Sequence, residues 1–178
     1  ELGWELHHPM EQMKSLYDVI YEAGKKEKII NFGTYAVNSL RMEKAYRGWG
    51  SELTGEISLV EAGMDRFFNL KKKNNFIGAK AVQEKIQSGV DIKIVYLEVD
   101  PDNADARGNE PVYHNGKVVG VVTSGGYGFR TKKSLAFAYV KSDLAETSNL
   151  EIEIQGKKRK ARILHKVVYD PENKKLTA

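Results

Sequence analysis

The sequence predicts an α+β protein in which a helical region precedes an all-β module. Over residues 10–23, apolar side chains recur at three- and four-residue spacing, which is typical of an amphipathic helix. Over residues 92–100, apolar and polar side chains alternate, which is typical of a strand. The dipeptide Asn115-Gly116 separates two further apolar runs and predicts a tight hairpin, since both of its turn positions need positive φ. We therefore expect a boundary near residue 90.

The first elements follow from local signals. Trp4 to His8 alternate between apolar and polar side chains and predict a short strand. Pro9 suits the first position of the helix over residues 10–23, because its missing N–H has no partner there in any case. Gly24 stands where a left-handed residue would end that helix.

Two more helices are predicted before the boundary. The second runs from Tyr35 to Tyr46 and is stopped by the following glycines. We expect its inward face to consist of Ala36, Leu40 and Ala45. Residues 51–76 are expected to be irregular, and a third helix is predicted over residues 78–87, ended by Gly89.

The second half predicts about six strands. Besides the strand over residues 92–100 and the Asn115-Gly116 hairpin, the strand pattern recurs at 135–140, 150–154 and 161–164. Gln155 to Lys158 predict the tip of another hairpin. The run Gly125-Gly126-Tyr127-Gly128 has neither a P-loop ending nor a Rossmann pattern, so we interpret it as a bulge or turn.

Composition narrows the possible functions. The 178 residues are 41% hydrophobic and include 17 Trp, Tyr and Phe residues (2, 9 and 6), as in a globular protein. The net charge of +4 favours anionic ligands only weakly. The chain has no cysteine, which excludes disulfides and thiolate metal sites, and its histidines lack zinc-site spacing, so no metal is expected. No apolar run approaches the roughly 20 residues of a membrane helix, so no membrane partner is expected.

The stretch from Ser39 to Thr54 carries the strongest functional signal. It combines two arginines with the aromatic residues Tyr46 and Trp49 and two carboxylates near a glycine-rich loop. An arginine can hold a carboxylate with two parallel hydrogen bonds, and an aromatic ring can stack on a planar ligand. A ligand with a flat head and an acidic tail suits this stretch. The alternative is a solvated helix face with Trp49 packed at its end.

That stretch and several other motifs resemble the aminomethyltransferase family, which includes the glycine-cleavage T-protein and the C-terminal regions of dimethylglycine and sarcosine dehydrogenases. The motifs follow the family's order over nearly the whole chain. They are Gly3-Trp4-Glu5-Leu6, Glu61-Ala62-Gly63, Phe76-Ile77-Gly78, Arg107-Gly108-Asn109-Glu110-Pro111, Thr123-Ser124-Gly125-Gly126 and Lys133-Ser134-Leu135-Ala136. Several of them are of the dehydrogenase type.

The resemblance implies a fold and a ligand site. The fold is the second half of a ferredoxin-like folate-binding region (residues 1–90) followed by a small Greek-key β-barrel aminomethyltransferase domain (residues 91–178). Glu5 matches the glutamate that holds the pterin ring, and Arg41 matches an arginine that contacts folate. Trp49 and Tyr46 are further candidate contacts. Simple solvent exposure of Glu5, and a network joining Arg41 to Asn38 or Glu43, are the structural alternatives.

The resemblance also implies tetrahydrofolate as the ligand and a small N-methyl amine as the carbon source. FAD belongs to an upstream domain, and the family's catalytic aspartate belongs to the N-terminal half. We therefore expect the chain to be a C-terminal piece that contains no catalytic residue and works with the N-terminal remainder of the same protein. The expected location is the cytoplasm, or the mitochondrial matrix in a eukaryote.

Three other functions remain open. A T-protein-type aminomethyltransferase would take its carbon from a lipoyl carrier, and a regulatory relative would not turn over at all. A nucleic-acid module is suggested by the basic runs Lys71-Lys72-Lys73 and Lys157-Lys158-Arg159-Lys160. Since these lysines are expected at loop tips without interleaved aromatics, no nucleic-acid partner is predicted.

Overall fold

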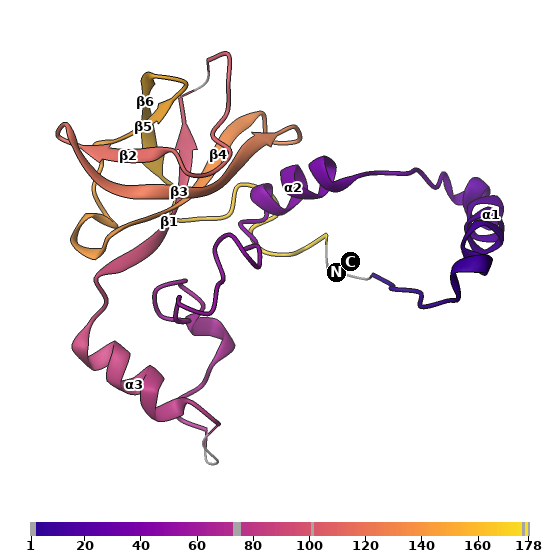
Figure 1. The fold of residues 1–178 in the computed structure, drawn as a ribbon, viewed down its shortest axis with the longest axis horizontal. Helices are drawn as coiled ribbons and strands as arrows, with labels where there is room; N and C mark the ends of the chain where they lie inside the picture. Colours follow the sequence, from indigo (N-terminus) through magenta and orange to yellow (C-terminus); the bar gives the residue numbers. More distant parts are fainter. Residues whose placement is uncertain (1–2, 73–75, 101, 176, 178) are drawn as a thin grey trace.

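The computed structural model describes residues 3–72, 76–100, 102–175 and 177, and Lys73 of the first basic run lies outside these ranges. In the described residues, three α-helices precede a closed antiparallel β-barrel (Figure 1). This arrangement confirms the predicted α+β class.

The barrel strands are β1 (Ile92–Val99), β2 (Pro111–His114), β3 (Lys117–Gly128), β4 (Lys133–Lys141), β5 (Leu150–Ile154) and β6 (Lys157–Ile163). Their order around the barrel is β1-β4-β3-β2-β5-β6. The successive strands β2, β3 and β4 are neighbours, and β1 lies beside β4 after a long connection, which is a Greek key. The predicted barrel type is confirmed.

Both predicted hairpin turns are present. Asn115 and Gly116 have φ of 49° and 77°, and Gln155 and Gly156 have φ of 51° and 75°. Two successive residues with positive φ match the twist of the flanking strands, which is why these short turns join β2 to β3 and β5 to β6.

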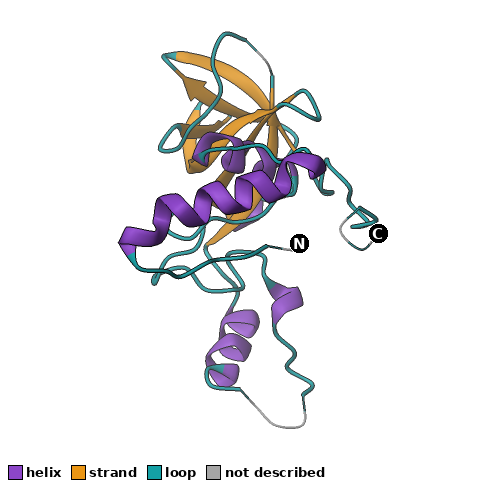
Figure 2. Cartoon of the chain, turned by 90° about the vertical axis from the view of Figure 1, so that its right-hand side faces the viewer, coloured by secondary structure: helices purple, strands orange, loops and turns teal. Residues whose placement is uncertain are grey.

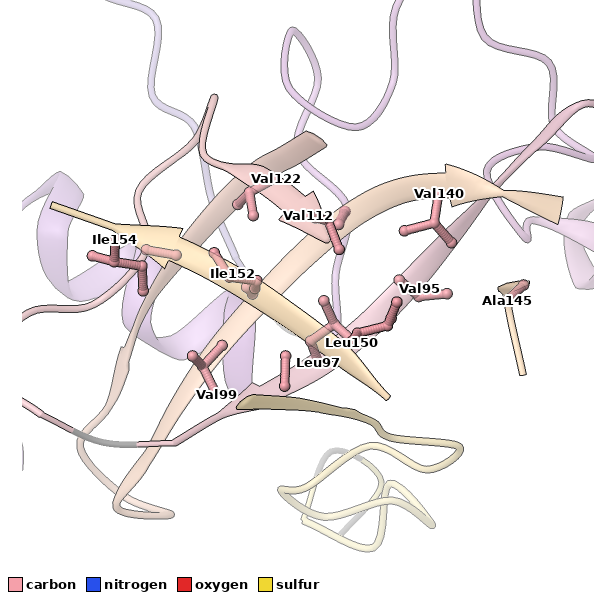
Figure 3. Packing of buried hydrophobic residues seen from close by; sticks show 14 residues of the cluster. Val95, Leu97, Val99, Val112, Val122, Val140, Ala145, Leu150, Ile152 and Ile154 are labelled. Atoms are coloured by element: carbon pink, nitrogen blue, oxygen red, sulfur yellow. The ribbon is translucent and has the colours of Figure 1, made fainter. Parts of the chain in front are cut away.

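Aliphatic side chains fill the barrel interior (Figure 3). They come from alternate positions of the strands, because successive side chains of a strand point to opposite faces. In β1 the interior positions are Val95, Leu97 and Val99. The residues between them face outward, and there Tyr96 packs with Phe137 of β4 in a second, smaller cluster that includes Met42. That second cluster joins the helical region to the barrel wall.

The first helix begins and ends differently from the prediction. A 3-10 turn, η1 (Met10–Gln12), precedes α1 (Met13–Gly24), and a second 3-10 turn, η2 (Lys25–Glu27), continues from it. The left-handed residue is Lys28, with φ of 59°, whereas Gly24 is right-handed. A Cβ on Gly24 would lie 2.8 Å from the Cβ of Ile29, so this glycine makes room for the returning chain.

The second helix, α2 (Thr34–Glu43), ends three residues earlier than predicted. The left-handed residue Ala45 follows shortly after its end. Of the predicted inward face of α2, Ala36 and Leu40 are wrong because both are exposed, whereas Ala45, just past the helix end, packs against the Met42 cluster. The buried residues of α2 are Ser39, Met42 and Glu43. Only the last turn of the helix meets the barrel, and it does so largely with polar side chains, so apolar spacing alone could not identify this face.

The strand predicted from Trp4 to His8 is absent, and these residues form no regular structure. A strand needs a hydrogen-bonding neighbour, and no strand among the described residues pairs with this segment. The third helix, α3 (Ala79–Ser88), and its end at Gly89 with φ of 80° confirm the prediction. Residues 51–72 are turns with one 3-10 segment, η3 (Asp65–Phe67), as expected.

Helix α1 stands apart from the barrel, while α3 projects from another side of the molecule (Figure 1). The view turned by 90° shows the same three parts: the barrel, the α1 helix and the α3 arm (Figure 2). None of residues 3–38, all of which are described, is buried. Among the described residues, no helix combines the length and the apolar character that crossing a lipid bilayer requires.

Candidate functional site

A buried carboxylate attaches the Ser39–Thr54 stretch to the barrel. Glu52 is fully buried, and its Oε2 accepts hydrogen bonds from Arg41 Nη1 at 2.9 Å and from the backbone N–H of Gly48 at 2.7 Å. Its Oε1 accepts from the hydroxyls of Thr123, at 2.6 Å, and Ser124 on β3. A buried charge is tolerated only when it is paired and hydrogen-bonded, and both conditions are met here.

A β-bulge explains how two successive β3 residues reach the same carboxylate. The register with β4 shifts between Val122 and Ser124, so Thr123 is the extra residue. In a regular strand Thr123 and Ser124 would point to opposite faces, and the bulge turns both toward Glu52.

The glycine-rich run after the bulge is part of β3, not a turn, which corrects the prediction; the bulge itself lies immediately before it. A Cβ on Gly125 would lie 2.4 Å from the carbonyl oxygen of Ala106, and one on Gly128 would lie 2.8 Å from the Glu43 side chain. These glycines allow another part of the chain to approach the strand backbone closely.

Arg41 is held on two sides and open on the third. Its Nε donates to Asn38 Oδ1 at 2.9 Å, and its Nη1 donates to Tyr46 O at 3.2 Å as well as to Glu52. Nη2 has no hydrogen-bond partner among the described residues. It is also not fully buried, so part of its surface reaches solvent. Since Nε and Nη1 are occupied, a two-pronged grip on a carboxylate is not available, and Nη2 remains as the donor that a ligand could meet.

Two tyrosines fasten the same stretch from the barrel side. Tyr139 of β4 donates its hydroxyl to Glu52 O at 2.8 Å, and Tyr96 of β1 donates to Met42 O at 2.7 Å. Burial, together with the nearby Glu52 carboxylate, raises the pKa of Tyr139 to about 12. Burial also raises the pKa of Tyr96 above its ordinary value, so both hydroxyls stay protonated and remain donors at neutral pH.

Arg47 has a structural role that the sequence interpretation missed. Its Nε donates to Ala62 O at 2.9 Å and its Nη1 to Ala45 O at 3.1 Å, while the guanidinium lies 5.6 Å from the Phe137 ring centroid. Burial and the charge of Arg66 lower its pKa. Since an arginine that binds main-chain carbonyls needs no acidic partner in the sequence, no motif could have identified this contact.

Of the other predicted site residues, Glu5 and Trp49 are exposed and Tyr46 is partly buried. The Glu5 side chain is 93% exposed, and its Oε2 lies 4.0 Å from His7 Nε2. Trp49 is 80% exposed and follows Tyr46, which lies beneath the Lys44 ammonium, 6.0 Å from its ring centroid. Arg41, Tyr46 and Trp49 thus lie in one stretch of the chain, within which Arg41 binds the main-chain oxygen of Tyr46. The structure shows no contact between this group and Glu5 within the described part of the chain.

The molecule also has pockets away from these residues. One of about 440 Å³ lies at an end of the barrel beside Asp100 and Lys160, and one of about 550 Å³ lies between α3 and the η4 turn (Ser142–Leu144). Neither is lined by a predicted site residue. In the described ranges no three His, Asp or Glu side chains are grouped so that they could hold a metal ion.

The described residues of the two basic runs lie on different elements. Lys71 and Lys72 lie in an exposed turn, and the second run lies in β6 rather than at a loop tip. Within that run Arg159 is buried, where it donates to Ala104 O at 2.6 Å and to Asn103 Oδ1 at 3.0 Å. This arginine fastens the connection between β1 and β2.

Two family models match the chain. The glycine cleavage T-protein C-terminal barrel domain matches residues 93–170, and the GCVT N-terminal domain matches residues 1–72. Human mitochondrial dimethylglycine dehydrogenase is 44% identical over 99% of this chain and 21% of that protein. Mouse mitochondrial sarcosine dehydrogenase is 30% identical over 99% of this chain and 20% of that protein.

A solved structure shows the same fold. The crystal structure of glycine cleavage system aminomethyltransferase T from Bartonella henselae aligns with a TM-score of 0.75 and 24% identity, covering 92% of this chain and 45% of that one. The chain thus spans about a fifth of the length of the dehydrogenases and just under half of the solved structure. On the two family models and these relatives, the chain belongs to the aminomethyltransferase family, that of the glycine-cleavage T-protein.

Proposed function

We propose that the chain is the C-terminal, folate-binding part of a longer enzyme that transfers a one-carbon unit to tetrahydrofolate. The observation that carries the proposal is the match to dimethylglycine dehydrogenase, at 44% identity over 99% of the chain. In this proposal residues 1–90 are part of a folate-binding domain, and residues 91–178 are the barrel domain that follows it.

The exposed apolar surface supports the existence of further chain. Large side chains lie in solvent along residues 3–40: Trp4, Leu6, Met10, Met13, Tyr17, Val19, Ile20, Ile30, Phe32, Tyr35, Val37 and Leu40. Large apolar side chains exposed in this number are typical of a binding site or of a contact with another part of the protein. We assign their cover to the N-terminal remainder of the same protein, since the relatives are several times longer than this chain.

The residues present suit the chemistry of tetrahydrofolate. A pterin edge offers parallel N–H donors, and the Glu5 carboxylate is free to accept two of them. The open Nη2 of Arg41 can donate to a ligand oxygen, and the exposed Trp49 offers a flat face. Tyr46 would pack on the side of the site that holds the pterin ring. Glu5 can reach the same ligand as Arg41, Trp49 and Tyr46 only if the remainder of the domain holds residues 3–8 beside them.

The task of these residues is to bind and orient the acceptor. A one-carbon unit released from an N-methyl amine as an iminium is lost to water unless its acceptor is held beside it, so positioning and the exclusion of water supply the catalysis. Amine oxidation by FAD and the acid-base step belong to parts of the protein upstream of this chain. We assign no catalytic residue within it, and we place the protein in the cytoplasm or in the mitochondrial matrix.

A T-protein-type aminomethyltransferase is the second candidate. It is favoured by the fold match to the Bartonella henselae enzyme, whereas the 44% identity to dimethylglycine dehydrogenase favours the first. A regulatory relative without turnover is the third. The intact protein would distinguish them by its flavin content and by its carbon donor.

Glu5→Ala in the intact protein tests the proposal. Loss of a carboxylate that accepts paired hydrogen bonds should cost about 2–3 kcal/mol, or roughly 30- to 150-fold in the dissociation constant for tetrahydrofolate. Amine oxidation measured with a dye acceptor should persist, and released formaldehyde should rise. Glu11→Ala, which changes another exposed glutamate nearby, is the matched control and should leave the constant unchanged. An unchanged constant for Glu5→Ala removes Glu5 from the site, and absence of tetrahydrofolate binding by the wild type contradicts the proposed function itself.

A further inference from the structure

The Glu52 carboxylate is a buried point at which the candidate ligand stretch is joined to the barrel. The side chain is 0% exposed, while that of Arg41 is 18% exposed. The edge of the Arg41 guanidinium that carries Nη1 is therefore fixed inside the protein, while part of the side chain reaches the surface. The four donors around Glu52 come from three places: Arg41 in α2, Gly48 in the following loop, and Thr123 and Ser124 in β3.

This arrangement determines which donor Arg41 presents. The guanidinium is planar, so fixing Nε against Asn38 and Nη1 against Glu52 leaves no rotation for Nη2. The same carboxylate accepts the Gly48 amide, and the main-chain oxygen of Glu52 accepts the Tyr139 hydroxyl. The loop that carries Trp49 is thereby tied to the position of Arg41.

From this geometry we infer that Glu52 is a positioning residue of the candidate site, which acts through Arg41 on the stretch from Arg41 to Leu53 and touches no ligand itself. The inference rests on the proposed function, because the stretch is assigned to tetrahydrofolate there. Glu52 was not among the residues singled out in the sequence. Its signal was a glutamate in a glycine-rich loop, which alone does not separate a buried partner from a solvated one.

A double-mutant cycle in the intact protein tests the inference. The dissociation constant for tetrahydrofolate is measured by calorimetry for the wild type, Arg41→Lys, Glu52→Gln and the double variant, at a temperature where all four are folded. Loss of the charged hydrogen bond from Arg41 to Glu52 should weaken binding about tenfold in the wild-type background. In the Arg41→Lys background the same change should weaken it less than about twofold, because the guanidinium that Glu52 orients is already gone.

Controls separate positioning from general destabilisation. Glu98→Gln removes another partly buried glutamate that is paired with Lys133 at 2.6 Å and Arg162 at 2.7 Å on the barrel wall. It should leave the constant unchanged. If Glu52→Gln does not fold, Glu52→Asp replaces it in both backgrounds, since the shorter side chain keeps the charge but withdraws it from Arg41.

The possible results are distinct. A non-additive cycle with an unchanged Glu98→Gln control supports positioning through Arg41. Equal fold-changes in both backgrounds, or no change in either, overturn the inference while the proposed function stands. A wild-type protein that does not bind tetrahydrofolate overturns the proposed function and the inference with it.

Discussion

The barrel and the N-terminal helical segment treat their apolar side chains in opposite ways. In the barrel, Leu97 and Ile152 are fully buried, and the six strands enclose a continuous aliphatic cluster. In residues 3–38, by contrast, no side chain is buried, and Trp4 and Phe32 lie mostly in solvent. The barrel closes its own hydrogen-bonded sheet, whereas α1 leaves an amphipathic face without a partner in the described residues.

The difference shows which part of the molecule can be stable by itself. Burial of apolar area is the dominant favourable contribution to folding, and a closed barrel has no unpaired edge. The stretch from Ser39 to Gly63 lies between the two extremes. It is attached to the barrel by Glu52, Tyr96 and Tyr139, with a small apolar contact at Met42, so polar contacts carry much of its order.

The largest test of this comparison is a pair of leucine substitutions. Leu97→Ala empties a fully buried position of the barrel and should lower the free energy of unfolding by about 2–5 kcal/mol. Leu40→Ala, at a position that is 58% exposed on α2, should change it by less than about 0.5 kcal/mol. Urea unfolding of this 178-residue chain gives both values. Equal losses would show that α2 is buried in solution and would break the comparison.

A smaller effect is expected where the attached stretch meets the barrel. Tyr139→Phe removes the hydroxyl that donates to Glu52 O, and it should cost about 1 kcal/mol, or somewhat more because the carbonyl oxygen then lacks this partner. Tyr35→Phe, at a residue that is 90% exposed, is the matched control and should cost nothing measurable. A cost near zero for Tyr139→Phe would mean that the stretch from Ser39 to Gly63 does not unfold together with the barrel.

The barrel could be predicted from the sequence because its signals are local. Alternation identified β1, and Asn115-Gly116 and Gln155-Gly156 identified two hairpins, since each turn depends on residues that accept positive φ. The second half therefore matched the prediction in class, strand number and topology. The resemblance to known proteins supplied the Greek-key order, which no local pattern contains.

The attached stretch could not be predicted in the same way because its contacts are long-range and polar. The burial of Ser39, Met42 and Glu43 depends on the barrel strands lying alongside, not on helical spacing. Glu52 was hidden for the same reason, since its partners Thr123 and Ser124 are about 70 residues away in the chain and reach it only through a bulge. Trp4 to His8 failed as a strand because alternation does not supply a neighbouring strand.

The smallest predicted effect concerns Glu61, which ties the loop to α3 and β1. Burial alone would raise the pKa of this carboxyl, but hydrogen bonding to Ser58, whose N–H donates at 2.7 Å, and the Lys85 ammonium at 3.2 Å lower it below its ordinary value of 4.5. Its main-chain oxygen accepts the N–H of Ile94 on β1 at 3.0 Å. Glu61 is thus joined to the third helix by its charge and to the barrel by its main chain.

The pH dependence follows from the direction of that shift. Because the folded pKa is below the unfolded one, the contribution of Glu61 is complete above about pH 4.5 and is lost as the pH falls through the folded pKa. The ammonium of Lys85 is partly exposed, so we expect at most about 1 kcal/mol. Urea unfolding between pH 3 and 7 should show a shallower acid loss for Glu61→Gln than for the wild type, while Glu56→Gln, at an exposed glutamate of the same loop, should leave the profile unchanged. Identical acid profiles for Glu61→Gln and the wild type would show that the loop and α3 are released before the barrel unfolds, which would place them with the N-terminal segment in the comparison.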